Sequence, residues 1–143
     1  MARGEIYSQE LGIDLQSGQD RELFKWLVAC LLFGRPIQQQ VSAKAFHELE
    51  NANLLTPKML QEAGWQRLVD VLGQGHYVRY DESTATRLLE ASKLLQEKYG
   101  GSVRRLLQAA ENKKDLQKRL IEFKGIGQKA SAIFMRDIEL HHV

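Results

Sequence analysis

The chain has 143 residues, a length typical of a single domain with its own hydrophobic core. Apolar residues make up 43% and charged residues 27%, an ordinary balance for a globular protein, and no apolar run reaches the roughly 18 residues that a membrane span needs. The one cysteine, Cys30, excludes an internal disulfide, an iron–sulfur cluster and a cysteine-rich zinc site.

Residues 1–19 are polar and rich in glycine and glutamine, which predicts a weakly ordered arm or a short helix ahead of a helical domain over residues 20–143. The stretch Met1–Glu5 lacks the apolar segment of a secretory signal. We therefore expect a cytoplasmic, nucleoid-associated protein that is a monomer.

Helical spacing of apolar residues begins at Asp20, which can cap a helix running to about Phe33. Cys30 lies in its apolar run and is expected to be a buried, inert thiol. Pro36 fits the first turn of a second helix, which runs to about Glu50. The buried stripe of the first helix is predicted to be Leu23, Phe24, Leu27, Val28, Leu31 and Leu32.

The middle of the chain continues the helical pattern. Thr56 and Pro57 open a short helix, and residues 65–72 form another. Residues 73–80 are predicted to be a loop. Asp81 or Ser83 then caps a long helix that ends at Gly100–Gly101.

Three further helices complete the chain. Ser102 caps a short one, and residues 113–122 and 128–140 form the last pair. Strand-like alternation is absent, so the predicted fold is all-α. We expect the core to include Trp26, Leu27, Leu31, Ile121, Ile126 and Ile133.

Positive charge is concentrated near the end of the sequence. Residues 104–136 contain nine Lys or Arg and three acidic residues, a local charge of +6 on a chain whose net charge is +2. A basic face of this kind is expected where a protein binds phosphates, although a solvated helix surface has the same composition.

The most informative stretch is Phe-Lys-Gly-Ile-Gly-Gln-Lys-Ala at residues 123–130, between the last two predicted helices. Gly125 and Gly127 permit a tight turn and let a phosphate approach the backbone, while Ile126 inserts into the core. The helix that starts at about Gln128 directs free N–H groups and its positive dipole end toward the turn. Lys124 and Lys129 add charge beside it, so these residues are predicted to hold DNA phosphates without reading sequence.

This pattern resembles the helix-hairpin-helix signature, and Lys129 makes it similar to the endonuclease III-like DNA glycosylases. The apolar segment 24–32, followed by polar and alanine-rich residues 38–45, resembles the paired early helices of that superfamily. The loop at 73–80, the long helix and the hairpin follow in the same order. The resemblance covers residues 20–140 and implies a partner that is double-stranded DNA, damaged or abasic.

The resemblance also implies a role for Lys129. In the family, the matching lysine attacks C1′ of the damaged nucleotide, the base leaves, and a Schiff base permits strand cleavage. The lysine must be a free amine to attack, which requires burial or nearby positive charge. The alternative is that Lys129 only binds phosphate.

The sequence departs from the family at the carboxylate that assists this chemistry. The family uses an Asp in a loop beyond the second helix, and the 14 residues after Lys129 offer no clear counterpart. Asp137 lies about 12 Å further along the predicted helix, so it is a weak catalytic candidate and is expected to be a surface or end-of-helix acid. The cysteine motif that binds the family's iron–sulfur cluster is also missing.

Extruding a base requires side chains that fill the gap left in the duplex. Two segments offer them, the loop at 73–80 and the connection between the early helices. The candidates are Arg35, Gln38, His76, Tyr77 and Arg79.

The hairpin of the family also holds a monovalent cation. By resemblance, Na⁺ or K⁺ would bind the backbone carbonyls of Ile121, Phe123 and Ile126, because hard cations prefer oxygen ligands. No other cofactor is expected.

Three functions remain open at this point: a glycosylase or abasic-site lyase that uses Lys129, a helix-hairpin-helix module that binds DNA backbone or distorted DNA without chemistry, and a helical domain whose basic face binds an acidic protein.

Overall fold

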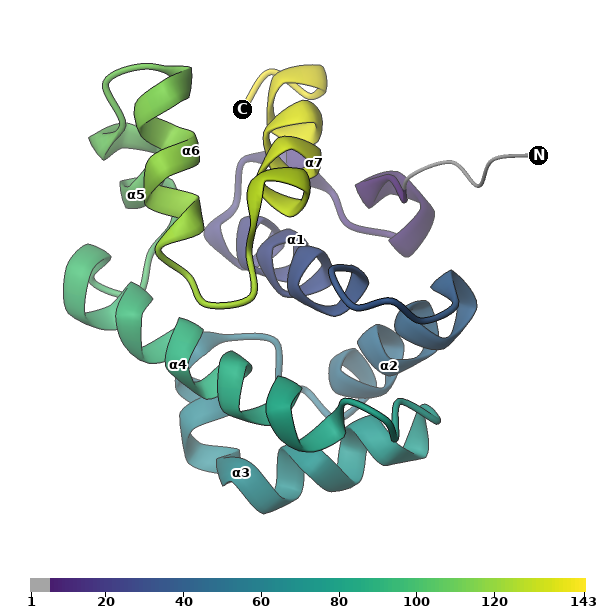
Figure 1. Cartoon of the computed structure of the whole chain (residues 1–143). Coiled ribbons are helices and arrows are strands. Elements are labelled where there is room, and N and C mark those ends of the chain that lie inside the picture. The colour runs from purple at the N-terminus through teal and green to yellow at the C-terminus, as the bar shows by residue number, and fades with distance from the viewer. Residues whose placement is uncertain (1–5) are drawn as a thin grey trace.

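The computed structural model describes residues 6–143, and that part of the chain contains helices and no strand (Figure 1). The predicted all-α fold is therefore confirmed. The α-helices are α1 (Asp20–Phe33), α2 (Gln39–Asn51), α3 (Pro57–Gln74), α4 (Asp81–Tyr99), α5 (Val103–Ala109), α6 (Lys113–Ile121) and α7 (Gln128–Leu140). None of these helices combines the length and apolarity that a membrane span requires.

The segment before α1, predicted to be a weakly ordered arm or a short helix, forms two short 3-10 helices, Ser8–Leu11 and Leu15–Ser17. Leu11, Ile13 and Leu15 are buried and belong to the main core. Residues 1–5 of the predicted arm lie outside the described residues. The segment is polar overall, but its aliphatic side chains from Ile6 onward are buried against the helices.

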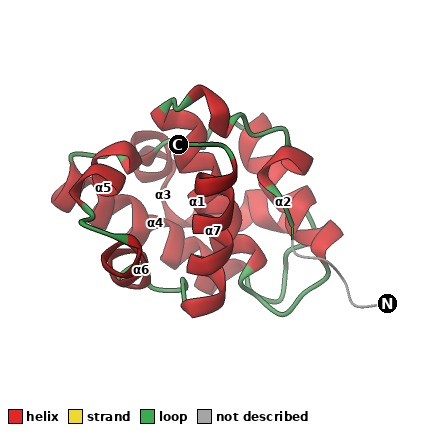
Figure 2. Ribbon diagram, turned by 90° about the horizontal axis from the view of Figure 1, so that it is seen from above, coloured by secondary structure: helices red, strands yellow, loops and turns green. Residues whose placement is uncertain are grey.

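Helix α1 lies in the middle of the molecule, with α2, α4, α5 and α7 packed around it (Figure 2). Trp26, Leu27 and Leu31 are buried, as predicted. The indole Nε1 of Trp26 donates a hydrogen bond of 3.2 Å to the carbonyl of Phe134, which ties α1 to α7. Since α1 is covered on most sides, nearly every residue from Leu23 to Leu32 is apolar.

Three predicted helix starts are wrong. Neither Asp81 nor Ser83 caps α4, which follows Tyr80 without a side-chain cap. Pro36 lies in a turn, and α2 begins three residues later, after Gln38. Asp20 does not cap α1, which follows Gln19 without a side-chain cap. Its carboxylate instead accepts hydrogen bonds from Ser102 Oγ at 2.5 Å and from the Arg104 amide at 3.1 Å. Asp20 therefore joins α1 to α5, a contact that local sequence cannot reveal.

Helix α3 bends at Gly64, where φ is +80°, so the two short helices predicted here form two arms of one element. Thr56 caps it as predicted, its Oγ1 accepting the Met59 amide at 3.1 Å. Helices α3 and α4 pack side by side. A methyl group on Gly75 would lie 2.8 Å from Ala45 Cα, so the missing side chain lets the loop before α4 rest on α2.

The end of the chain follows the prediction closely. Gly100, with φ of +64°, ends α4, and Ser102 caps α5 through a 3.1 Å bond from the Arg105 amide. Ile126 is buried and Ile133 is partly buried. Ile121 was expected in the core but is 41% exposed, because α6 buries Leu120 and the chain leaves the helix immediately afterwards.

Candidate nucleic-acid interface

The turn between α6 and α7 is anchored by two buried side chains, Phe123 and Ile126. The Ile126 amide donates to the Phe123 carbonyl at 2.9 Å, which closes the turn around Gly125. Gly125 has a φ of +100°, a conformation that favours glycine. The predicted hairpin is therefore present, and Figure 1 shows it running from α6 to α7 beside α4.

The two glycines of the hairpin have different surroundings. A methyl group on Gly125 would lie 2.9 Å from both Arg87 Cδ and Leu31 Cδ2, whereas one on Gly127 would meet no atom within 4 Å. Gly125 is therefore required by packing and backbone angle. Gly127 leaves an open approach to the backbone at the start of α7.

The first turn of α7 has no side-chain cap. Its first helical hydrogen bond runs from the Ser131 amide to the Gly127 carbonyl at 2.9 Å. The amides ahead of Ser131 accordingly retain their hydrogen-bonding capacity, and they lie at the positive end of the helix dipole. Gln128 and Lys129, both exposed, flank this anion-binding position, and Lys124 is exposed on the other side of the turn.

A pocket of about 490 Å³ opens between the hairpin and the end of α1. Its wall includes Lys129 on α7 and Arg35 after α1, and no carboxylate of residues 6–143 lines it. The lining residues are Cys30, Phe33, Gly34, Arg35, Pro36, Gly125, Gly127, Gln128, Lys129, Ala130 and Ile133. The structure thus brings together the two segments that sequence analysis selected separately, the hairpin and the connection after α1.

Cys30 is buried, as predicted, and forms part of the apolar wall of this pocket. Burial raises the pKa of its thiol well above the usual range. The thiol is therefore neutral and contributes surface to the pocket, not charge.

Lys129 makes no hydrogen bond or ion pair with any of residues 6–143. Its amine is free to contact a ligand in the pocket or a phosphate outside it.

Asp137 is not the surface acid that sequence analysis expected. It is completely buried, accepts the Ser8 amide at 2.7 Å, and pairs with Arg136 Nε at 2.7 Å. The carboxylate therefore holds the N-terminal segment on α7. The expectation failed because the covering segment comes 129 residues earlier in the chain.

Arg35 lies against the start of α4. Its guanidinium donates to Ser83 Oγ at 2.7 Å and to Thr84 Oγ1 at 3.4 Å, and lies 5.0 Å from the centre of the Tyr80 ring. Burial and the nearby Arg87 lower the pKa of Arg35. Arg87 was not selected from the sequence, although its position beside the buried stripe of Thr84 and Leu88 on one helix face is an unusual place for a cation.

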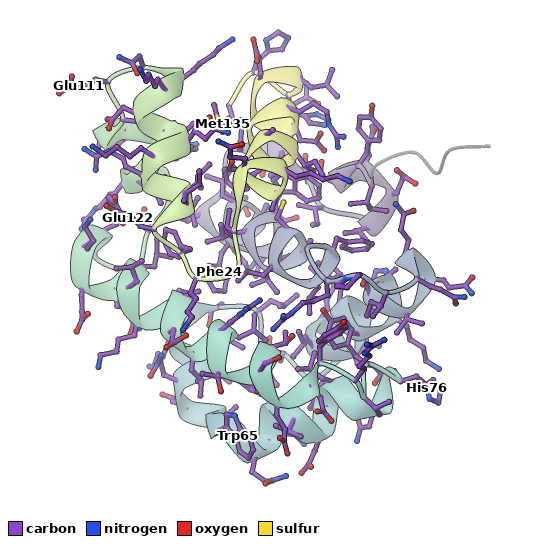
Figure 3. All side chains as sticks on the ribbon, in the orientation of Figure 1. Phe24, Trp65, His76, Glu111, Glu122 and Met135 are labelled. Atoms are coloured by element: carbon purple, nitrogen blue, oxygen red, sulfur yellow. The ribbon has the colours of Figure 1, made fainter. Side chains whose placement is uncertain are left out.

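A second, smaller pocket of about 280 Å³ lies between the start of α2 and the loop before α4. Gln38, His76 and Arg79 line it and are exposed, so three of the predicted DNA-contacting residues share one groove. His76 has a φ of +66°, and Figure 3 shows its side chain pointing away from the body of the molecule. Val78, which sequence analysis passed over, is 64% exposed in the same loop.

Tyr77 does not belong with these exposed residues. It is 1% exposed, and its hydroxyl donates to the Leu32 carbonyl at 2.8 Å. Burial raises the pKa of Tyr77 to about 12. The prediction that Tyr77 stacks on a base is wrong, because α1 offers a carbonyl at its C-terminal end that the phenol satisfies.

The three carbonyls predicted to hold a cation are not equivalent. The Phe123 carbonyl already accepts the Ile126 amide, while those of Ile121 and Ile126 accept no hydrogen bond from residues 6–143. A carbonyl oxygen has two lone pairs, so the turn retains oxygen ligands at each of the three positions.

Comparison with known proteins identifies one family. The family model described as Ogg-HhH, 8-oxoguanine DNA glycosylase, matches residues 9–143. No curated protein and no solved structure matches the sequence.

Proposed function

Because the chain belongs to the helix-hairpin-helix family of 8-oxoguanine DNA glycosylases, we propose that it binds damaged or abasic double-stranded DNA and acts on it through Lys129. The observation that carries this proposal is the pocket in which Lys129, the hairpin backbone and Arg35 meet. This pocket would bring a DNA-binding face and a nucleophilic amine together at one place.

DNA binding is supported by the arrangement of the hairpin. The uncapped first turn of α7, the open space at Gly127 and the exposed Lys124 offer a phosphate hydrogen bonds and charge together. These contacts hold the backbone in register whatever the base sequence. Na⁺ or K⁺ at the carbonyls of Ile121, Phe123 and Ile126 would add charge to the same turn.

Base extrusion is supported by the groove at Gln38, His76 and Arg79. The exposed apolar side chain of Val78 is suited to occupy the gap in the base stack, with polar groups beside it for the unpaired base. We propose that the extruded nucleotide enters the pocket next to Lys129, whose wall includes Phe33, Cys30 and Ile133. The family's description makes 8-oxoguanine the first base to test.

The chemistry we propose is abasic-site lyase activity. Lys129 Nζ attacks C1′ of the open-chain sugar, and water leaves as the C=N bond forms. Loss of a C2′ proton to solvent then breaks the C3′–O bond, which releases the 3′ phosphate as the leaving group. Base removal needs a carboxylate to stabilise positive charge on the sugar, and none of residues 6–143 supplies one to the wall of this pocket. We therefore expect lyase activity to exceed glycosylase activity.

Borohydride trapping tests this proposal. Incubating the protein with abasic duplex DNA and borohydride should give a covalent adduct that Lys129→Gln abolishes and Lys124→Gln retains. Both substitutions remove one exposed positive charge of the hairpin, so they differ in chemistry and not in electrostatics.

The alternative is a non-catalytic module that binds DNA backbone or distorted DNA, favoured because the pocket wall beside Lys129 has no carboxylate among residues 6–143. Wild-type protein that binds abasic DNA but forms no adduct would establish that alternative. An adduct that persists in Lys129→Gln would assign the attack to another amine.

A further inference from the structure

Two arginines beside the hairpin lack an acidic partner. Arg35 and Arg87 are both half-buried, yet neither forms an ion pair with any of residues 6–143. Arg35 has only the hydroxyls of Ser83 and Thr84 and the ring of Tyr80, and Arg87 makes no hydrogen bond at all within the described residues.

The other partly buried arginines among residues 6–143 are paired. Arg119 binds Asp115 at 3.0 Å, and Arg136 binds Asp137 at 2.7 Å. Desolvating a charge without a partner is costly, so folded proteins normally provide one. At Arg35 and Arg87 the fold instead places two like charges close enough for Arg87 to lower the pKa of Arg35.

The location of the pair points to its ligand. A methyl group on Gly125 would lie 2.9 Å from Arg87 Cδ and 3.4 Å from its Nη1, so Arg87 lies directly beside the hairpin turn. Arg35 lines the same pocket as Lys129. An anion held by both arginines would therefore lie on the α4 side of the hairpin, away from the start of α7.

We infer that Arg35 and Arg87 bind one phosphate of the DNA strand, distinct from the phosphate held by the first turn of α7. Each guanidinium presents a fork of N–H donors that matches two phosphate oxygens. A phosphate would supply the negative charge that no acidic side chain of residues 6–143 provides to Arg35 and Arg87. This inference rests on the proposed function, because it takes the ligand of the neighbouring pocket to be a DNA strand.

The test compares Arg87→Gln with Lys93→Gln, an exposed cation on the same helix whose loss changes the net charge equally. The probe is duplex DNA with one tetrahydrofuran abasic-site analogue, and the measurement is affinity against salt concentration. Arg87→Gln should reduce the slope of log affinity against log salt by about one, while Lys93→Gln should leave it unchanged. Arg87→Lys should restore the slope.

A second measurement separates ligand binding from a structural role. Since Arg87 and Arg35 repel each other in the free protein, Arg87→Gln should lower the unfolding midpoint no more than Lys93→Gln does. A large drop in the midpoint, or an unchanged salt slope, overturns the inference. If the slope is unchanged and inorganic phosphate at constant ionic strength raises the unfolding midpoint, the two arginines form a site for free phosphate, and the inference is again overturned.

Failure of this inference can be told apart from failure of the proposed function. A borohydride adduct with an unchanged slope in Arg87→Gln rejects the arginine site alone. A reduced slope without any adduct from the wild type rejects the Lys129 chemistry alone.

Discussion

Lys124 and Lys129 differ in what surrounds them, although both are exposed cations of the hairpin. Lys129 lines the pocket between the hairpin and α1, and Lys124 does not. Lys124 therefore offers a ligand only its positive charge, whereas Lys129 also borders a pocket that could admit a sugar. We therefore propose that Lys124 binds the DNA backbone and that Lys129 carries the chemistry.

Lys124→Ala should weaken DNA binding by a similar factor for all duplex sequences. A side chain that neutralises one phosphate releases one condensed counterion, so the slope of log affinity against log salt should fall by about one. Fluorescence anisotropy at several salt concentrations measures it, with Lys93→Ala as the control. An unaltered slope would show that Lys124 does not contact phosphate.

At the scale of elements, the hairpin depends on two glycines for separate reasons. Gly125 joins the turn to α1 and α4 in a positive-φ conformation, and Gly127 leaves the start of α7 open. Gly125 thus allows the hairpin to pack against α1 and α4, and Gly127 allows a ligand to reach the backbone amides at the start of α7. Substitutions at the two positions should therefore affect different properties.

Gly125→Ala should lower the free energy of unfolding by about 1–3 kcal/mol, because the new methyl group combines backbone strain with contacts under 3.0 Å to Arg87 and Leu31. Gly127→Ala should cost less than about 1 kcal/mol, the range for a weaker N-cap, but should reduce DNA affinity by obstructing the phosphate. Urea unfolding and DNA titration distinguish the two. Equal loss of stability in both variants would contradict this division.

At the scale of the whole molecule, the first and last described segments are joined in the core. Asp137 accepts the Ser8 amide, and Arg136 lies with its guanidinium carbon 3.7 Å from the centre of the Tyr7 ring. The position of α7, and hence of Lys129 at its start, depends on this contact. A substitution at Asp137 should therefore affect activity only by lowering the stability of the fold.

Asp137→Asn should lower the free energy of unfolding by about 2–4 kcal/mol, because a neutral amide replaces the buried carboxylate that accepts the Ser8 amide and pairs with Arg136. Glu139→Gln, which breaks only the exposed pair with Lys113, should cost less than about 1 kcal/mol. At a temperature where both variants stay folded, borohydride trapping should match the wild type. Normal stability with lost trapping would instead make Asp137 catalytic.

The hairpin and the order of the helices were predictable because they depend on local chemistry. Glycine spacing permits the turn at 125–127, Ser102 and Thr56 cap the helices that follow them, and apolar spacing identifies the buried side of α1. Each of these signals involves residues within a few positions of one another. They can therefore be recognised without knowing which distant element packs against them.

The sequence by itself thus determined an all-α chain with a helix-hairpin-helix turn and a lysine at its mouth. Only the tertiary structure decided that Tyr77 and Asp137 are buried, that Ile121 is exposed, and that Arg87 lies beside the hairpin. Those outcomes depend on which surface of a distant element covers each residue. Periodicity along one helix cannot specify that partner, because burial is a property of the packed elements together.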